Sequence, residues 1–143
     1  NYGLSRLLAG YAWEWKTNKD EYIDYDIDIE GVKLRWNSVT EDWVNSPNAI
    51  NEVGCIHTIQ GYDLNYAGVI IGPEMSYYEN KNEIVVDRDK YLDFNSRRTI
   101  SDLKELEIYI KNIYKTLLTR GINGTYVYVV DKNLSEYLRR FIY

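Results

Sequence analysis

The stretch "NEVGCIHTIQGYDLNYAGVIIGPE", residues 51–74, holds two short apolar runs with a polar segment between them. The runs, residues 53–58 and 66–72, are partly β-branched, which is typical of parallel strands covered on both faces. The polar segment contains the only histidine of the chain, His57. In open α/β sheets, ligands bind beyond the carboxyl ends of strands, where loops gather polar side chains and backbone N–H groups. The stretch therefore predicts a buried strand that leads into a candidate binding segment.

Turn residues and alternating patterns predict the elements that precede this stretch. Residues 4–15 favour a buried strand and its exit, because they are rich in apolar and aromatic side chains. Residues 25–37 alternate between apolar and charged side chains around a turn at residues 30–31, which predicts a half-exposed hairpin. Residues 45–51 contain Ser, Pro and several Asn, which is typical of a loop.

The apolar runs that follow continue the alternation of strands and helices. Residues 82–89, after a polar turn at residues 79–82, form a third run of the kind covered on both faces. Residues 125–131 have the β-branched and aromatic composition of a strand. Residues 133–143 have the pattern of a closing amphipathic helix.

A long helix is predicted between these runs, because apolar residues recur there at spacings of three and four. The apolar stripe consists of Ile100, Leu103, Leu106, Ile110, Ile113, Tyr114 and Leu117. Thr99 and Asp102 have the spacing of a capping box at its start, and Gly121 is placed to stop it.

These elements together predict an α/β fold with a mainly parallel sheet and an inserted antiparallel hairpin. The chain has 143 residues, of which 45% are hydrophobic and 27% charged. Such a length and composition are typical of one globular domain, here residues 1–143.

Composition also excludes several classes of protein. The net charge is -5, so binding to nucleic acid by overall charge alone is not expected. One cysteine, Cys55, permits neither an internal disulfide nor a cysteine-based zinc site. No apolar stretch of about 18 residues occurs, so a membrane span is not expected, and a cytoplasmic location is. The chain begins without Met inside a strand-like run, which suggests a piece of a longer polypeptide.

The polar segment holds five residues suited to a ligand: His57, Thr58, Gln60, Gly61 and Asp63. Gly61 permits close approach of a ligand to the backbone, and Asp63 can accept a hydrogen bond from a sugar hydroxyl. The same residues also fit a tight strand exit with a core histidine and a capping Asp. Their spacing alone does not separate these two interpretations.

A second candidate segment is "YKTLLTRGINGTYVYV", residues 114–129. Thr119 and Arg120 follow the predicted helix and precede a predicted strand. A guanidinium at such a junction suits bidentate binding of phosphate oxygens. The alternative is a cation that interacts favourably with a helix C-terminus.

In this order, the two segments resemble the C-terminal motor domain of superfamily 1 helicases. Residues 56–71 are similar to the fifth helicase motif of the RecD-like and Schlafen-related branches, in which a His, a Gln-Gly pair and an acidic residue precede a strand. Residues 114–121 are similar to the sixth motif, in which an apolar run leads into Thr-Arg. With "RLLAGYAWEW", residues 6–15, the chain resembles nearly end to end the Schlafen-group-3-like DNA/RNA helicase domain family.

The resemblance implies a RecA-like, three-layer domain that is the second of two lobes closing over ATP. It implies that Arg120 is the catalytic arginine, which reaches the γ-phosphate and stabilises charge in the transition state. The backbone N–H of Gly61 would lie near the same phosphate, and Asp63 would face the ribose. Gln60 and Thr119 would belong to the same ATP site.

The resemblance also implies the partners. His57 and Thr58 would couple the nucleotide to a DNA or RNA strand that crosses both lobes. The chain contains no Gly-x-x-x-x-Gly-Lys-[Ser/Thr] loop and no acidic pair suited to magnesium. The N-terminal RecA-like lobe of a full-length protein would therefore supply the phosphate-binding loop for ATP and the ligands of Mg²⁺. No metal ligand is expected in this chain, and the chain alone would be inactive.

Departures from the motifs leave two rival hypotheses. Cys55 stands where related branches carry Thr, Asp63 replaces the commoner Glu, and Gly121 stands where Ala is usual. One rival is a regulatory or interaction module that kept the fold and lost the motor. The other, unrelated to the resemblance, is a small hydrolase that uses His57 with Asp63. Against it, Cys55 and His57 would share one face of an extended strand without a third group to orient them.

Overall fold

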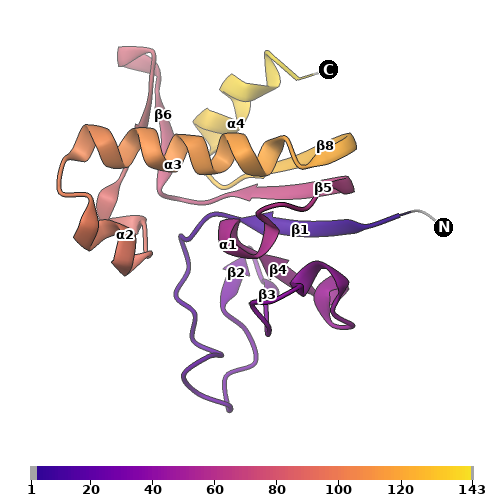
Figure 1. The fold of residues 1–143 in the computed structure, drawn as a ribbon. Helices are drawn as coiled ribbons and strands as arrows, with labels where there is room; N and C mark the ends of the chain where they lie inside the picture. The colour runs from indigo at the N-terminus through magenta and orange to yellow at the C-terminus, as the bar shows by residue number, and fades with distance from the viewer. Residues whose placement is uncertain (1–2, 143) are drawn as a thin grey trace.

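A computed structural model describes residues 3–142, shown as a ribbon in Figure 1. The strands are β1 (Ser5–Ala9), β2 (Ile27–Ile29), β3 (Val32–Trp36), β4 (Glu52–Gly54), β5 (Leu64–Ile71), β6 (Met75–Tyr78), β7 (Glu83–Val86) and β8 (Gly121–Val129). The α-helices are α1 (Ile56–Ile59), α2 (Phe94–Thr99), α3 (Leu103–Leu118) and α4 (Lys132–Arg139). Short 3-10 turns are η1 (Trp43–Asn45), η2 (Ala49–Asn51), η3 (Glu79–Lys81) and η4 (Arg88–Lys90).

The main sheet has six strands in the order β2-β3-β4-β1-β5-β8. β1 lies between β4 and β5 and pairs with both in parallel, and Leu7 is in register with Val53 on one side and Gly68 on the other. β8 is parallel to β5, and β3 is parallel to β4. Only β2, at the edge, is antiparallel to its neighbour within this sheet. The predicted α/β fold with a mainly parallel sheet is confirmed.

The predicted hairpin at residues 25–37 is also confirmed, and it extends the sheet at one edge. Glu30 and Gly31 form its turn with φ angles of 52° and 89°. Two successive residues with positive φ are characteristic of the tight turns that match the right-handed twist of hairpin strands. The predicted loop at residues 45–51 contains the end of η1 and the whole of η2.

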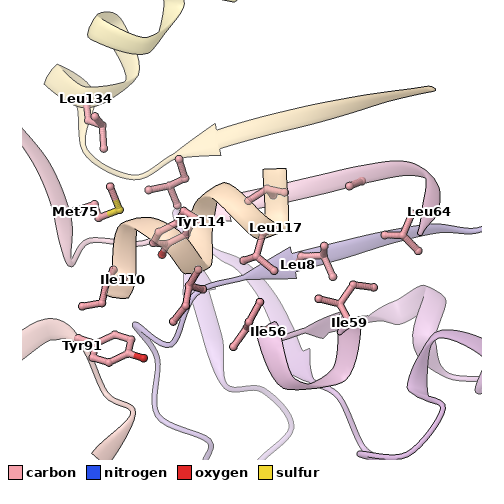
Figure 2. Packing of buried hydrophobic residues seen from close by; sticks show 14 of the residues in the cluster. Leu8, Ile56, Ile59, Leu64, Met75, Tyr91, Ile110, Tyr114, Leu117 and Leu134 are labelled. Carbon is pink, nitrogen blue, oxygen red and sulfur yellow. The ribbon is translucent and has the colours of Figure 1, made fainter. Parts of the chain in front are cut away.

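One face of the sheet is covered by α1, α3 and α4. Leu8 of β1, Ile59 of α1, Leu117 of α3 and Leu134 of α4 belong to one core cluster there, and each of these side chains is fully buried. Figure 2 shows Leu8 between α1 and α3, with Leu64 further along the same layer. Five residues of the predicted stripe are buried in α3 and cover this face: Leu106, Ile110, Ile113, Tyr114 and Leu117. The other two differ from the prediction, because Ile100 lies before α3 and Leu103 is 63% exposed.

The opposite face of the sheet has no helix on it among residues 3–142. A smaller cluster, which includes Ala9, Trp36 and Ile70, is covered by the hairpin and by residues 11–15. Further toward β8 this face is open, and Tyr126 is 74% exposed. The expectation of three layers is therefore wrong for the described residues, in which helices cover only one face of the main sheet.

The strand predicted at residues 53–58 ends at Gly54, and the chain turns into α1. Thr58 explains the turn, because its hydroxyl accepts a hydrogen bond from the Cys55 N–H at 3.0 Å and thereby caps the helix. A short apolar run does not distinguish a buried strand from a buried helical turn.

The run at residues 82–89 also differs from the prediction. Its strand, β7, is half-buried and pairs with β6 in a separate antiparallel sheet of two strands. The polar turn at residues 79–82 is confirmed as η3 and the left-handed Asn82. β6 was not predicted, since Met75–Tyr78 has little alternation of its own.

The ends of α3 differ from the prediction as well. Asp102 is the cap, and its side chain accepts hydrogen bonds from two backbone N–H groups of the first turn. Thr99 instead ends α2, which was not predicted. Gly121 does not stop the helix, because it is the first residue of β8, where a Cβ would lie 2.2 Å from the Gly124 carbonyl oxygen.

The last two predicted elements are confirmed with shifted bounds. The strand predicted at residues 125–131 is β8, which begins four residues earlier. The closing helix predicted at residues 133–143 is α4, and Tyr143 lies outside the described residues. In the described part of the chain, every helix is too short or too polar to cross a membrane.

Candidate functional site

The segment from His57 to Asp63 runs from the edge of the sheet formed by the carboxyl ends of the parallel strands to the edge formed by their amino ends. α1 begins directly after the carboxyl end of β4, and residues 60–63 lead to the amino end of β5. Because β4 and β5 are both parallel to β1, these two ends lie at opposite edges of the sheet. The expectation that the whole segment lies beyond the carboxyl ends of the strands is therefore wrong: only its start does.

Asp63 lies beside Arg120, at the amino ends of β5 and β8. The Leu64 N–H donates to the Arg120 carbonyl oxygen at 2.8 Å, and the pairing of the two strands begins with Leu64 and Gly121, the next residue. The Arg120 Nη1 atom is 3.8 Å from Asp63 Oδ1 and donates to the Tyr62 carbonyl oxygen at 3.4 Å. The two candidate segments of the sequence thus meet at one edge of the sheet.

Gly61 adopts a left-handed conformation at this edge, with φ of 81°. A Cβ built on Gly61 would meet no heavy atom within 4 Å, so the backbone there faces open space. A side chain would strain the left-handed backbone although there is room for it. The amino edge therefore combines an accessible backbone, a carboxylate and a guanidinium.

Thr119 precedes Arg120 and ends α3. Its hydroxyl donates to carbonyl oxygens of the last helical turn, those of Lys115 at 3.1 Å and Thr116 at 3.0 Å. Arg120 Nε also donates to the Thr116 carbonyl oxygen, at 3.3 Å. The Thr119 hydroxyl and the Arg120 Nε–H group therefore both donate hydrogen bonds to carbonyl oxygens at the end of α3.

His57 and Gln60 line a shallow hollow of about 200 Å³ between α1 and α3. Thr116 lines the same hollow and accepts the hydrogen bond from Arg120. The hollow therefore extends from His57 on α1 toward the last turn of α3, which Arg120 follows.

His57 is paired with a residue that the sequence did not single out. Its Nε2 atom lies 4.0 Å from Oδ2 of Asp93, and its ring centroid is 6.1 Å from that of Tyr11. Asp93 caps α2 and accepts a hydrogen bond from the Ser96 hydroxyl at 2.7 Å. The Asp-x-x-Ser spacing at residues 93–96 is a helix-start signal that could have revealed the cap, but it says nothing of His57.

Cys55 and Thr58 are both buried, with exposed fractions of 1% and 4%. The Cys55 sulfur accepts a hydrogen bond from the Tyr11 hydroxyl at 3.2 Å, and burial raises the pKa of that hydroxyl. Because residues 56–59 are helical, the extended arrangement in which Cys55 and His57 share a strand face is wrong. Any role of Thr58 toward a nucleic acid is therefore indirect in this arrangement.

Glu74 is a buried carboxyl group that the sequence analysis did not identify. It is 0% exposed, its Oε1 atom accepts a hydrogen bond from the Tyr114 hydroxyl, and its Oε2 atom has no partner among residues 3–142. Burial raises the pKa of this group to about 7. The sequence contains no signal for this burial, because "GPE" is typical of an exposed turn.

The comparisons with known proteins agree with the motifs. A family model described as "Schlafen group 3, DNA/RNA helicase domain" matches residues 1–131. An uncharacterized protein of Saccharomyces cerevisiae, YPL245W, is 35% identical over 148 residues, which cover 97% of this chain and 32% of that protein. The chain thus spans about a third of this relative, and no solved structure matches. The predicted resemblance is confirmed, and the chain belongs to the Schlafen group 3 DNA/RNA helicase domain family.

Proposed function

We propose that this chain is the second motor lobe of a nucleic-acid-dependent ATPase, a DNA or RNA helicase or translocase that acts in the cytoplasm. The lobe would be RecA-like and would complete an ATP site whose phosphate-binding loop lies in another part of a longer protein. The observation that carries the proposal is the meeting of Gly61, Asp63 and Arg120 at one edge of the sheet.

The arrangement at this edge suits the phosphates of ATP. The Arg120 guanidinium has a permanent charge and several donors, so it can stabilise the charge that develops during phosphoryl transfer. Gly61 is exposed and has open space beside its Cα atom, so a phosphate oxygen can approach its backbone closely. In this proposal the Asp63 carboxylate accepts a hydrogen bond from the ribose, and Gln60 and Thr119 flank the site.

α1 provides the proposed link between nucleotide and nucleic acid. His57 lies near the carboxyl end of β4, and Gly61 lies on the way to the opposite edge, so a single short segment reaches both. A strand of DNA or RNA held beside His57 would thus be joined to the phosphate edge through one helical turn. Asp93 would keep the imidazole oriented toward that strand.

Mg²⁺ has no place on this lobe in the proposal. Three or more His, Cys, Asp or Glu side chains do not gather into a possible metal site within the described residues. In this proposal the N-terminal RecA-like lobe holds the ion that accompanies ATP, and the residues here act on the nucleotide alone.

The proposal is tested by ATP hydrolysis in the full-length protein with and without single-stranded DNA or RNA. Arg120→Ala is expected to lower turnover by at least about a hundredfold, since arginines that stabilise phosphoryl transfer contribute about a thousandfold or more. Arg98→Ala, which removes an exposed arginine from α2, is the matched control and should leave turnover unchanged. A wild-type protein without nucleic-acid-stimulated hydrolysis, or an Arg120→Ala protein with normal turnover, would refute the proposal.

An interaction module without motor activity is the second candidate. The open face of the sheet favours it, because Leu7, Tyr66 and Tyr126 line an apolar hollow of about 480 Å³ there. The hydrolase hypothesis is weaker, since His57 pairs with Asp93 rather than Asp63 and the Cys55 thiol is buried. A folded wild-type full-length protein that does not hydrolyse ATP would make the interaction module the better explanation.

A further inference from the structure

The Arg120 side chain is folded back onto its own lobe. Its Nε and Nη1 atoms donate to the carbonyl oxygens of Thr116 and Tyr62, at 3.3 and 3.4 Å. Nη1 also lies 3.8 Å from the Asp63 carboxylate. The side chain is only 25% exposed as a result, although it stands at the edge of the sheet. In this conformation the guanidinium is held by groups of its own lobe rather than extended away from it.

The Asp63 side chain is in a different situation, because it is 66% exposed. Arg120 is the only cationic side chain within 4.0 Å of it in the described part of the chain. An ion pair with one partner this exposed is weak, since the exposed group remains largely hydrated and is screened by salt. This contact is therefore one that a ligand with more negative charge can displace.

We propose that Asp63 and Arg120 form a latch that the nucleotide opens by binding both partners. This inference rests on the proposed function. A phosphate group offers the guanidinium several charged oxygens in a bidentate geometry, so Arg120 leaves the carboxylate for the phosphate. The released Asp63 carboxylate then accepts a hydrogen bond from a ribose hydroxyl. One molecule that carries both a ribose and phosphates is needed to satisfy both residues.

The latch predicts that one substitution strengthens the binding of inorganic triphosphate without an equal gain for ATP. Asp63→Asn removes the charge that holds Arg120 and also weakens the contact with the ribose. Inorganic triphosphate has no ribose, so it should inhibit ATP hydrolysis by the full-length Asp63→Asn protein at about two- to fivefold lower concentration than in wild type, as expected for the loss of an exposed ion pair. The KM for ATP should not fall in parallel, because the ribose contact is weakened.

The experiment measures the inhibition constant of inorganic triphosphate and the KM for ATP, at low and high salt, for wild type and Asp63→Asn. The difference in triphosphate inhibition should shrink at high salt, because screening already weakens the wild-type latch. Glu79→Gln removes one charge from the β6–β7 turn and serves as the control, with both constants unchanged.

Each other outcome overturns the latch. Unchanged triphosphate inhibition with a raised KM for ATP would make Asp63 a ribose ligand only. Weaker binding of both ligands would make it a structural residue. Either result leaves the proposed function intact provided that Arg120→Ala still abolishes hydrolysis, whereas a wild-type protein that does not hydrolyse ATP overturns both proposals.

Discussion

The Glu74 carboxyl group is fully buried, and one of its two oxygen atoms has no partner among residues 3–142. Its pKa is raised to about 7 by burial, above the value of 4.5 for a free glutamate. The folded protein therefore binds a proton here that the unfolded chain releases between these two values. The stabilising contribution is fully present below pH 4.5 and is lost as the pH rises through about 7.

Glu74→Gln should remove this pH dependence, because an amide keeps the shape of the side chain and cannot ionise. The free energy of unfolding of wild type, relative to the variant, should fall between pH 5 and pH 8 by an amount on the order of 2 to 3 kcal/mol. Urea denaturation at both pH values measures the difference, with Glu79→Gln as an exposed control. Parallel pH profiles for wild type and Glu74→Gln would show that Glu74 does not titrate in this range.

Short motifs indicate candidate residues but not the contacts that packing creates, and the roles of the candidate residues stay predictions. Arg120 and Asp63 were identified from short motifs before the fold was known. Asp93 was missed as the partner of His57, because its own surroundings predict only a helix cap. Glu74 was missed because its burial depends on Tyr114, which is 40 residues away in the chain.

At the level of elements, α3 shows how a cap can be assigned to the wrong residue. Asp102 accepts hydrogen bonds from the N–H groups of Lys104 and Glu105, at 2.8 and 3.0 Å. Asp102→Ala should therefore lower the free energy of unfolding by about 1 kcal/mol, since it removes the cap and a favourable charge at the helix N-terminus. Thermal or urea unfolding measures this loss.

Thr99→Ala is the matched substitution for the cap that the sequence predicted. The Thr99 hydroxyl is exposed and donates only to the Asn95 carbonyl oxygen within α2, at 2.9 Å. Its removal should change the free energy of unfolding by less than about 0.5 kcal/mol, which is typical of surface sites. A larger loss for Thr99→Ala than for Asp102→Ala would contradict the observed helix start.

Elements with long, regular patterns were predicted correctly, and short ones were not. The stripe of α3 and the alternation of the β2–β3 hairpin each repeat often enough to indicate one structure. Residues 53–58 are too few to separate a strand from a strand followed by a helical turn. The pairing of β7 with β6, rather than with the main sheet, is a tertiary choice that no local pattern contains.

At the scale of the whole fold, one face of the sheet is open near β8 within residues 3–142. Tyr126→Ser should change the free energy of unfolding by no more than about 0.5 kcal/mol, because this side chain is 74% exposed. Leu117→Ala, on the covered face, is fully buried and should cost about 2 to 5 kcal/mol. Urea denaturation of both variants compares the two faces. A loss above about 2 kcal/mol for Tyr126→Ser would mean that the face is packed in solution.

The sequence by itself determined the long helix, the hairpin, the mainly parallel α/β character and the family, because each depends on side chains close together in the chain. Only the tertiary structure decided that helices cover one face, that α1 joins opposite edges of the sheet, and that Arg120 lies against Asp63. These features depend on the order of strands in the sheet. β5 and β8 are neighbours in the sheet although several elements separate them in the chain, and local periodicity does not indicate that pairing.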